Sequence, residues 1–387
     1  MFLLSRGSLV AHGMVLAILV LPHYGTLQYG AFSGPGEFCG GFGPRECVPE
    51  CYCQYYPYEQ FGSVGFVRLT CSIDLFLNEG FSKDLLLARY TNAWTGSAPS
   101  QRLEFSRIFF LETGGHGSLT ARIACAVESA ARMHPHWTVH LLSADYGEAS
   151  RGNTTFAGPF AQLLRSIPNV VVSVVRPQDV FQGTPLEPWY KSGILNKSAY
   201  PVEHLADALR LAVLYKHGGV YLDTDVVVMR PLDSLPPCNG GDMVSNGFLA
   251  FHRGDPFLQY LMELARHVYR PREWSSIGPW LLRRATLARC GANTVTVLLG
   301  RRCGGDTGFK VMPHWMFLPV PAEGWDVFFT ANASRKAWLM SAGSYVMHVY
   351  NKLSSRAHAV PGCAYREAAE VFCHDSMQLS LNINGIF

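Results

Sequence analysis

The segment from residue 203 to residue 229, EHLADALRLAVLYKHGGVYLDTDVVVM, constrains the fold more than any other part of the chain. Apolar residues recur at helical spacing over 203–217, which predicts an amphipathic helix. Gly218 and Gly219 follow, and glycine provides the left-handed geometry that commonly ends a helix. Residues 220–229 are apolar and β-branched, which is typical of a strand buried on both faces of a parallel sheet.

Asp223 and Asp225 lie within this predicted strand. Alternate residues of a strand point to the same side, so both carboxylates can face one centre. Carboxylates this close repel each other unless a cation lies beside them, and Mg²⁺ or Mn²⁺ would leave positions open for water and substrate phosphates. Alternatively, the two residues cap a loop after a strand that ends early, or pair with basic residues. The preceding helix, the two glycines and the apolar flanks favour a metal and a diphosphate.

Strands and helices alternate along the rest of the chain. The pattern predicts helices at 119–133 and 160–165, and strands at 107–112, 138–142, 170–175, 245–251 and 344–352. This order predicts an α/β fold with a mainly parallel sheet that helices flank. Ligands of such sheets bind beyond the carboxyl ends of the strands, so the loops there carry the chemistry.

Residues 206–232, ADALRLAVLYKHGGVYLDTDVVVMRPL, resemble the donor-site segment of the α1,4-galactosyltransferase and α1,4-N-acetylglucosaminyltransferase family. Ordered co-occurrence of several motifs is more specific than one motif, and the resemblance covers most of the chain after about residue 100. Further stretches similar to the family, in the same order, are IFFLETGG (108–115), CAVESAARMHP (125–135), TPLEPWY (184–190), NGFLAF (246–251), GPWLL (278–282) and HVYNK (348–352).

The resemblance implies a GT-A-like nucleotide-diphospho-sugar transferase fold. It also implies a retaining glycosyltransferase that uses Mn²⁺ and UDP-galactose, UDP-GalNAc or UDP-GlcNAc. The sugar would pass in α1,4 linkage to a β-galactoside-type glycolipid or glycan acceptor. No catalytic nucleophile is identifiable from the sequence, and return of the acceptor hydroxyl on the same face stays open.

The resemblance also assigns roles to single residues. Asp223, Asp225 and His348 would bind the metal, and Lys352 would join the two aspartates in catalysis by carrying charge on the departing diphosphate. The implied donor-binding residues are Leu111, Glu112, Thr113, Asp207, Arg210, Tyr221, Asp223, Thr224, Asn246, Gly247, Gly278 and Lys352.

Plainer roles compete with several of these assignments. Asp207 and Arg210 lie three residues apart on a helix and can form a salt bridge, so Asp207 could orient Arg210 without touching a ligand. Asn-Gly at 246–247 is also a common turn pair. A single histidine in an apolar strand, such as His348, is more often a core residue than a ligand. The chain has Ser276-Ile277 where the family often has His-Gln, which predicts altered specificity if that pair touches a substrate.

Composition supports a folded enzyme with an N-terminal extension. Of the 387 residues, 48% are hydrophobic and 16% are charged, which predicts one catalytic domain, at 101–387. Residues 23–100 are predicted to form a Cys-rich lumenal stem. The net charge of +3, without a dense basic block, argues against a nucleic-acid partner.

The N-terminal apolar run at 9–22, which Arg6 precedes, predicts a cytosolic tip and signal anchor within residues 1–22. The run is shorter than the roughly 20 residues of a comfortable span, so a cleaved signal peptide is the alternative. The family is similar to type II Golgi proteins, which favours an anchor. We therefore expect a single-pass Golgi membrane protein with a lumenal catalytic domain.

Sequons and cysteines are consistent with a lumenal location. Asn153, Asn196 and Asn332 begin acceptor sequons for N-glycosylation. The chain has 11 cysteines, an odd number, so at least one is unpaired or paired between chains, as in a disulfide-linked or weak homodimer. Disulfides fit the N-terminal cysteine cluster better than a zinc site does; its members are Cys39, Cys47, Cys51, Cys53 and Cys71.

Two other classes of function compete with a glycosyltransferase. The sequence DTDVV at 223–227 also resembles the D-x-D-x-[TV] motif of phosphohydrolases that use an aspartate nucleophile. That motif normally opens the core domain, whereas here more than 100 residues of α/β pattern come before it. An inactive, sugar-binding Golgi protein is the third class. The intact aspartate pair argues against loss of activity.

Overall fold

The computed structural model describes residues 105–114, 118–145, 157–240, 245–304 and 308–387, and the backbone of three strands nearer the N-terminus. The chain divides into two compact units, Met1–Ser82 and Lys83–Phe387. In the first unit, an antiparallel sheet has the order β1-β3-β2, formed by β1 (Ile18–Leu21), β2 (Cys51–Tyr56) and β3 (Gly65–Cys71).

Most of the predicted signal anchor and stem, the side chains of the N-terminal cysteine cluster, and Asn153 lie outside the described residues. The domain boundaries at residues 22 and 100 therefore stay predictions. In the described ranges, no helix combines the length and the apolar character needed to cross a bilayer.

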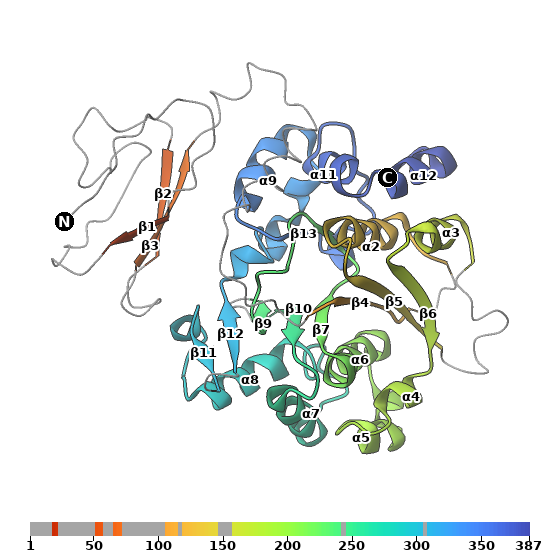
Figure 1. Ribbon diagram of the computed structural model, residues 1–387, viewed down its shortest axis with the longest axis vertical. Helices are drawn as coiled ribbons and strands as arrows, with labels where there is room; N and C mark the ends of the chain where they lie inside the picture. Colours follow the sequence, from red (N-terminus) through yellow and green to blue (C-terminus); the bar gives the residue numbers. More distant parts are fainter. Residues whose placement is uncertain are drawn as a thin grey trace. The chain divides into compact units, whose positions relative to one another are not determined.

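An eight-stranded sheet forms the centre of the second unit, in the order β11-β12-β9-β10-β7-β4-β5-β6 (Figure 1). The pairs β4–β5, β5–β6, β4–β7 and β9–β12 are parallel, whereas β7–β10, β9–β10 and β11–β12 are antiparallel. The strands are β4 (Arg107–Glu112), β5 (Thr138–Ala144), β6 (Val170–Val175), β7 (Gly219–Leu222), β9 (Cys238–Gly240), β10 (Ser245–Phe251), β11 (Arg302–Cys303) and β12 (Phe309–Met312).

Helices cover both faces of this sheet (Figure 1). On one face lie α2 (Ala121–Met133) and α3 (Pro159–Ser166), with α11 (Ala364–Phe372) and α12 (His374–Asn384) packed on them. On the other lie α6 (Pro201–His217), α7 (Pro256–Val268) and α8 (Pro279–Cys290). Shorter helices are α4 (Pro177–Phe181), α5 (Glu187–Lys191), α9 (Ser334–Ser341), α10 (Asn351–Ser354), η4 (Ile194–Lys197), η5 (Thr296–Leu298), η6 (His314–Met316), η7 (Ala322–Phe328) and η8 (Ala331–Ala333).

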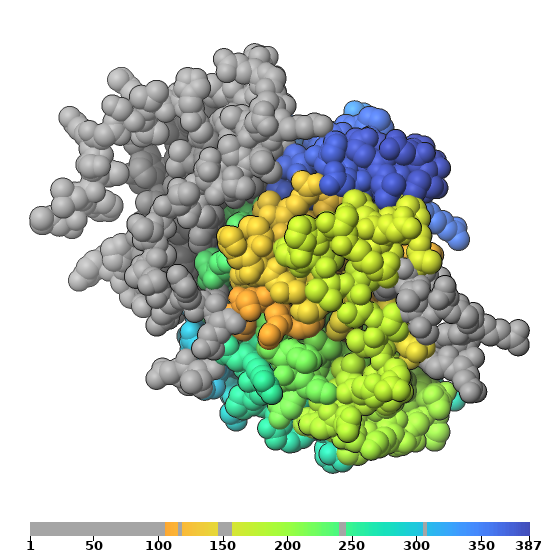
Figure 2. Space-filling view, turned by 45° about the vertical axis from the view of Figure 1, so that its right-hand side comes forward, coloured from red at the N-terminus to blue at the C-terminus, as the bar shows by residue number. Residues whose placement is uncertain are grey.

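The C-terminal helices are attached firmly to α2. Cys125 of α2 forms a disulfide with Cys373, and buried Glu128 accepts hydrogen bonds from the N–H and the hydroxyl of Ser376. Figure 2 shows this C-terminal segment, in blue, directly against the yellow segment that contains α2 and α3. The chain's end therefore packs on the same core as its first described helix.

Cysteine pairing in the described residues agrees with the disulfide prediction in part. A second disulfide joins Cys290 at the end of α8 to Cys303 of β11. Cys238 and Cys363 are free and buried, so neither thiol is placed to form a disulfide between chains. The predicted homodimer stays a prediction.

Most predicted elements are confirmed, but two strands are shorter than expected. The strand predicted at 220–229 is two strands, β7 and β8 (Val226–Val228), because the chain turns at the aspartates and leaves the central sheet. The strand predicted at 344–352 ends early, as β13 (Val346–His348), and α10 follows it. β8 and β13 pair antiparallel in a separate two-stranded sheet.

Candidate metal centre

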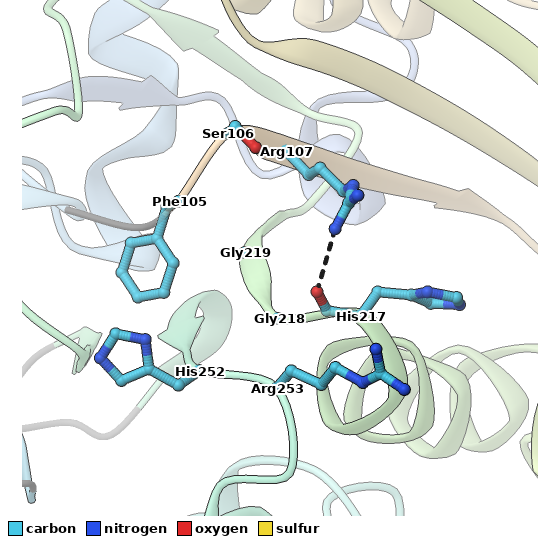
Figure 3. A pocket seen from close by; sticks show the side chains of 8 residues that line it. All are labelled: Phe105, Ser106, Arg107, His217, Gly218, Gly219, His252 and Arg253. Atoms are coloured by element: carbon cyan, nitrogen blue, oxygen red, sulfur yellow. Dashed lines mark hydrogen bonds between the residues drawn. The ribbon is translucent and has the colours of Figure 1, made fainter.

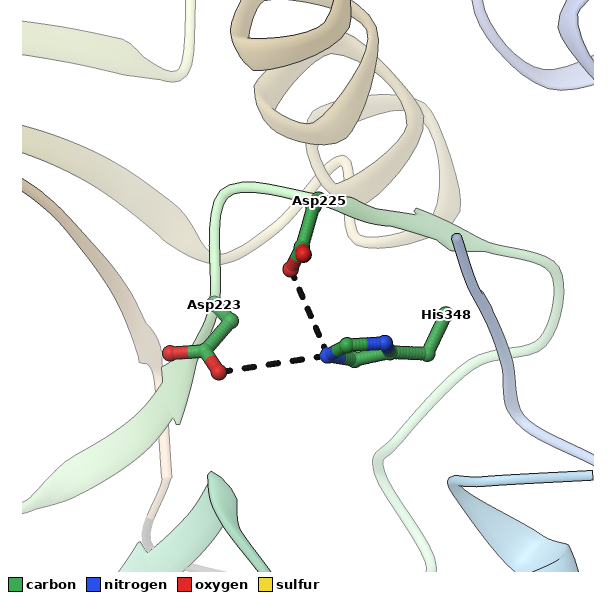
Figure 4. Close-up of side chains that lie close together, drawn as sticks. All are labelled: Asp223, Asp225 and His348. Carbon is green, nitrogen blue, oxygen red and sulfur yellow. Dashed lines mark ion pairs between the residues drawn. The ribbon is translucent and has the colours of Figure 1, made fainter. Parts of the chain in front are cut away.

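Asp223, Asp225 and His348 converge on one point, as Figure 4 shows. Asp223 follows β7, Asp225 precedes β8, and His348 ends β13. The Nε2 atom of His348 lies 3.3 Å from Oδ1 of Asp225 and 3.9 Å from Oδ2 of Asp223. One ligand atom from each residue lies within 4.8 Å of the others. The structure thus brings together the set predicted to bind metal, although the aspartates lie in a turn and not along one strand.

The pairing of β8 with β13 explains how His348 reaches the aspartates. His348 lies opposite Val226, the residue after Asp225. The N–H of Val349 donates to the carbonyl of Asp225 at 2.9 Å, and the N–H of Asn351 donates to Oδ2 of Asp225 at 2.7 Å. These backbone contacts fix both the main chain and the carboxylate of Asp225.

The carboxylate of Asp223 is held through one of its two oxygens. Its Oδ1 accepts a hydrogen bond from the hydroxyl of Tyr221 at 2.7 Å and lies 3.2 Å from Nη1 of Arg210. The guanidinium of Arg210 also lies over the ring of Tyr221, 4.4 Å from its centroid. The other oxygen of Asp223, Oδ2, faces His348. One oxygen is therefore anchored, and the other points toward the centre of the cluster.

A buried network on α6 and β10 supports this anchor. Asp207 lies 3.0 Å from Nη2 of Arg210 and accepts a hydrogen bond from Nδ2 of Asn246 at 2.7 Å. Nη1 of Arg210 donates to the carbonyl of Asn246 at 2.7 Å. Since Asp207 is buried and occupied by these two partners, its contacts fit the role of orienting Arg210.

Two glycines of the predicted site allow close approach to these carboxylates. A Cβ atom on Gly247 would lie 2.6 Å from Oδ2 of Asp223. A Cβ atom on Gly278 would collide with Oδ2 of Asp207 and would lie 3.0 Å from Nδ2 of Asn246. Neither position can hold a side chain without displacing a carboxylate.

The charges of the cluster are strongly coupled. Burial alone would raise the pKa of Asp223, but Arg210 and His348 outweigh burial and hold that pKa well below its usual range. Burial alone would lower the pKa of His348, but Asp225 and Asp223 outweigh it and raise that pKa. A cation at this point would compensate the charge of both carboxylates and would be bound by the neutral imidazole. Two carboxylates and an imidazole are a suitable ligand set for a divalent cation such as Mn²⁺.

The end of β4 contributes three further predicted residues, all buried: Leu111, Glu112 and Thr113. Oε1 of Glu112 accepts a hydrogen bond from the N–H of Gly114 at 2.7 Å. Its Oε2 is buried and has no hydrogen-bond partner among the described residues. Because buried acceptors are nearly always satisfied, this oxygen is positioned to accept a hydrogen bond from a ligand.

Lys352 does not point at the aspartates in this structure. It lies on α10, and its ammonium forms an ion pair of 2.7 Å with Glu203 on the first turn of α6. Contact of Lys352 with a diphosphate stays a prediction and requires the ion pair with Glu203 to open.

Thr224, another of the predicted donor-binding residues, lies in the turn between the two aspartates.

A cavity of about 160 Å³ lies elsewhere, at the amino ends of β4 and β7 (Figure 3). Its lining includes Arg107, His217 and Arg253, and Nη1 of Arg107 donates to the carbonyl of His217 at 3.3 Å. Ligands of open α/β sheets bind at the carboxyl ends of strands. This cavity is therefore separate from the metal centre.

Two protein families match the chain. Residues 120–240 match a glycosyltransferase sugar-binding region containing the DXD motif, and residues 250–380 match the α1,4-glycosyltransferase conserved region. Lactosylceramide 4-alpha-galactosyltransferase of Mus musculus is 33% identical over 254 residues, which are 65% of this chain and 69% of that relative. The chain belongs to the α1,4-glycosyltransferase family.

Other similarities are more distant. Alpha-1,4-N-acetylglucosaminyltransferase of Homo sapiens is 27% identical over 257 residues, which are 65% of this chain and 73% of that relative. The solved PaToxG glycosyltransferase is 17% identical, with a TM-score of 0.39, over 56% of this chain and 75% of that chain.

Family membership settles the class of protein. The chain is a retaining glycosyltransferase with a GT-A-like fold, and its DXD motif is Asp223-Thr224-Asp225. A phosphohydrolase and an inactive sugar-binding protein are not favoured.

Three contacts of the site had no signal in the sequence. The N–H of Asn351 binds Asp225 through the backbone, which any residue but proline could do. Glu203 was predicted only as part of a helix, yet it pairs with Lys352. Tyr350 has a left-handed backbone, with φ of 53°, and its N–H lies 3.3 Å from Nδ1 of His348.

Proposed function

We propose that this glycosyltransferase transfers galactose or an N-acetylhexosamine from a UDP-sugar to a β-galactoside-type glycolipid or glycan. The product would carry the sugar in α1,4 linkage. The acceptor hydroxyl would bond to the anomeric carbon as the bond from that carbon to the UDP oxygen breaks. The hydroxyl proton would pass to a phosphate oxygen of the departing UDP, and the configuration would be retained. The observation that carries this proposal is the convergence of Asp223, Asp225 and His348 at the carboxyl end of β7.

Mn²⁺ is the proposed cation, held by these three side chains. When bound, it would stabilise the negative charge that develops on the diphosphate of the leaving UDP. The chain's own contribution is preorganisation, because Arg210 and Tyr221 anchor one oxygen of Asp223. The N–H of Asn351 anchors one oxygen of Asp225, Oδ2, in the same way.

The nucleoside is proposed to lie beside the end of β4. The unpaired Oε2 of Glu112 would accept a hydrogen bond from a ribose hydroxyl or from the N–H of uracil. β4 pairs with β7 in parallel, so the carboxyl end of β4 lies at the same edge of the sheet as the aspartates.

Lys352 is proposed to balance charge on the departing diphosphate after it leaves Glu203. The side chain of Lys352 is 62% exposed, so the exchange of partners costs little burial. The four-residue spacing from His348 keeps its backbone beside the metal centre.

The proposed location is the Golgi lumen, with a type II membrane anchor. Asn196 and Asn332 are exposed, so both sequons are accessible to a glycosylating enzyme. Two disulfides in the described residues agree with an oxidising compartment.

The test is transfer by the full-length protein. UDP-galactose, UDP-GalNAc and UDP-GlcNAc would be supplied in turn, with Mn²⁺ and either methyl β-lactoside or lactosylceramide as acceptor, and the product linkage would be determined by NMR. We expect one donor to give an α1,4-linked product. A β-linked product, or no transfer from any of these donors to lactosides or lactosylceramide, would contradict the proposal.

A further inference from the structure

A partly exposed cluster with two aromatic rings lies beside the candidate metal centre. It consists of Trp274, Tyr200, Lys352 and Glu203. The ammonium of Lys352 lies 5.4 Å from the ring centroid of Trp274 and 5.9 Å from that of Tyr200, while it pairs with Glu203 at 2.7 Å. Trp274 is 47% exposed, and no aromatic ring of the described residues stacks on it. The indole of Trp274 therefore presents an apolar surface to solvent next to a charged pair.

The loop that carries Trp274 is held in place by a buried histidine. Nε2 of His204 lies 3.1 Å from the carbonyl oxygens of both Glu273 and Trp274. Its Nδ1 lies 2.8 Å from the hydroxyl of Tyr269, and His204 is fully buried. The backbone of Trp274 is therefore anchored from beneath while its ring stays open to solvent. Because this part of the backbone is already ordered, less entropy is lost when a ligand binds against the ring.

The cluster borders the donor pocket on two sides. Glu203 lies four residues before Asp207 on α6, so the two side chains share a face one turn apart. On the loop, Gly278 lies four residues after Trp274 and its Cα packs against the carboxylate of Asp207. The donor-pocket residue Asp207 is thus buried, and the aromatic cluster next to it is open.

We propose that Trp274 and Tyr200 form the acceptor subsite and bind the terminal galactoside of the acceptor. This inference rests on the proposed function. A pyranose presents an apolar face of C–H groups, which would stack on the indole of Trp274. Its hydroxyls would donate hydrogen bonds to the carboxylate of Glu203, which Lys352 frees when it turns to the diphosphate.

The exposure of the cluster identifies its occupant as the acceptor. The donor's diphosphate belongs to the metal centre, where Asp207 and Arg210 are buried. An acceptor sugar that is attached to a lipid or a longer glycan must enter from solvent, and the open ring of Trp274 permits this entry. A few well-placed polar groups beside an aromatic surface are typical of small-ligand sites.

The test compares Trp274→Ala and Trp274→Phe with the wild-type full-length protein. The KM for methyl β-lactoside, the KM for the UDP-sugar, and UDP release without acceptor would be measured. Trp274→Ala should raise the acceptor KM about tenfold, through loss of one aromatic contact. Trp274→Phe should recover most of this loss. The donor KM and UDP release should not change, since the proposal places the ring against the acceptor and not against the donor.

Trp280→Ala is the matched control. Trp280 also lies beside a cation, 5.3 Å from Arg284, but it is on α8 and outside the cluster. It should leave the acceptor KM unchanged. An unchanged acceptor KM in Trp274→Ala, or a rise confined to the donor KM, would overturn the assignment.

Direct binding separates this inference from the proposed function. Saturation-transfer NMR would detect methyl β-lactoside on each variant without any turnover. If the wild type transfers no sugar from any donor, the proposed function fails, and the binding measurement still decides the subsite. Binding that Trp274→Ala abolishes supports it. Binding that Trp274→Ala retains, or no binding by the wild type, overturns it.

Discussion

The guanidinium of Arg210 lies 3.2 Å from the carboxylate of Asp223, and this contact joins helix α6 to the metal centre. The same guanidinium lies 3.0 Å from Asp207, and both Arg210 and Asp207 are buried. The single side chain of Arg210 therefore neutralises the buried Asp207 and orients Asp223 toward the candidate metal centre. Through these two contacts, Arg210 connects the buried part of α6 with the carboxylate that is predicted to bind the metal.

Arg210→Met should destabilise the protein by about 3 kcal/mol, because it leaves the Asp207 carboxylate buried without its partner. Arg210→Lys should not restore full activity, because one ammonium cannot contact both carboxylates and the Asn246 carbonyl in the geometry of the fork. Denaturant unfolding and transfer assays would measure the two effects. Arg266→Met, on the exposed face of α7, is the matched control and should change neither. Equal stability of Arg210→Met and wild type would refute the role of this link.

Gly247→Ala should lower turnover about 100-fold, because its Cβ would lie 2.6 Å from Oδ2 of Asp223 and would move a metal-facing oxygen. Gly324→Ala is the control, since its Cβ would meet Val320 at an ordinary 3.4 Å and its φ is negative. Transfer assays and thermal melts of both variants would be compared. If the two variants had the same activity, the close approach at Gly247 would have no functional meaning.

Local patterns predicted the order of elements well. The helix predicted at 203–217 and the strand predicted at 170–175 are present as α6 and β6. The helical spacing of apolar residues and a run of β-branched residues are both local properties of the sequence, so they can be recognised without knowing the fold. The run at 220–229 forms two strands, whereas its pattern predicts one. Its apolar, β-branched residues do suit strands on both sides of the turn, but the change of partner from β10 to β13 depends on distant segments.

The three side chains that converge were predicted as a set, but their geometry was not, and their binding of a metal stays a prediction. Asp223 and Asp225 converge through a turn. His348 joins them through the pairing of β8 with β13, two strands that lie more than 100 residues apart in the sequence. The ion pair of Lys352 with Glu203 could not be predicted, because neither spacing nor composition links α10 to the first turn of α6.

A buried histidine far from the site predicts a pH effect on stability. Nε2 of His134 accepts the N–H of Leu232 at 2.7 Å, and Nδ1 lies 2.9 Å from the carbonyl of Ala130. Burial lowers the pKa of His134 below its usual value. At mildly acidic pH, His134 therefore binds a proton in the unfolded chain but not in the folded protein. Stability should fall as pH drops below the unfolded pKa of about 6.5, and the loss should level off below the folded pKa.

His134→Gln should make this pH dependence shallower, even if the variant is less stable at neutral pH. Urea unfolding of wild type and variant between neutral and mildly acidic pH would give both slopes. His136→Gln, an exposed neighbour, controls for loss of a histidine. Parallel slopes for wild type and His134→Gln would show that His134 is not the source.

The most direct test of the central claim is the binding of Mn²⁺ to the full-length protein, measured by isothermal titration in the presence of UDP. Asp223, Asp225 and His348 meet within 4.8 Å, so the wild type should bind one Mn²⁺. Asp225→Asn and His348→Ala should each weaken this binding by about tenfold or more, in the range typical of losing support at a metal site. Arg266→Met, on the exposed face of α7, should leave it unchanged. Wild-type affinity for Mn²⁺ in both Asp225→Asn and His348→Ala would contradict the account.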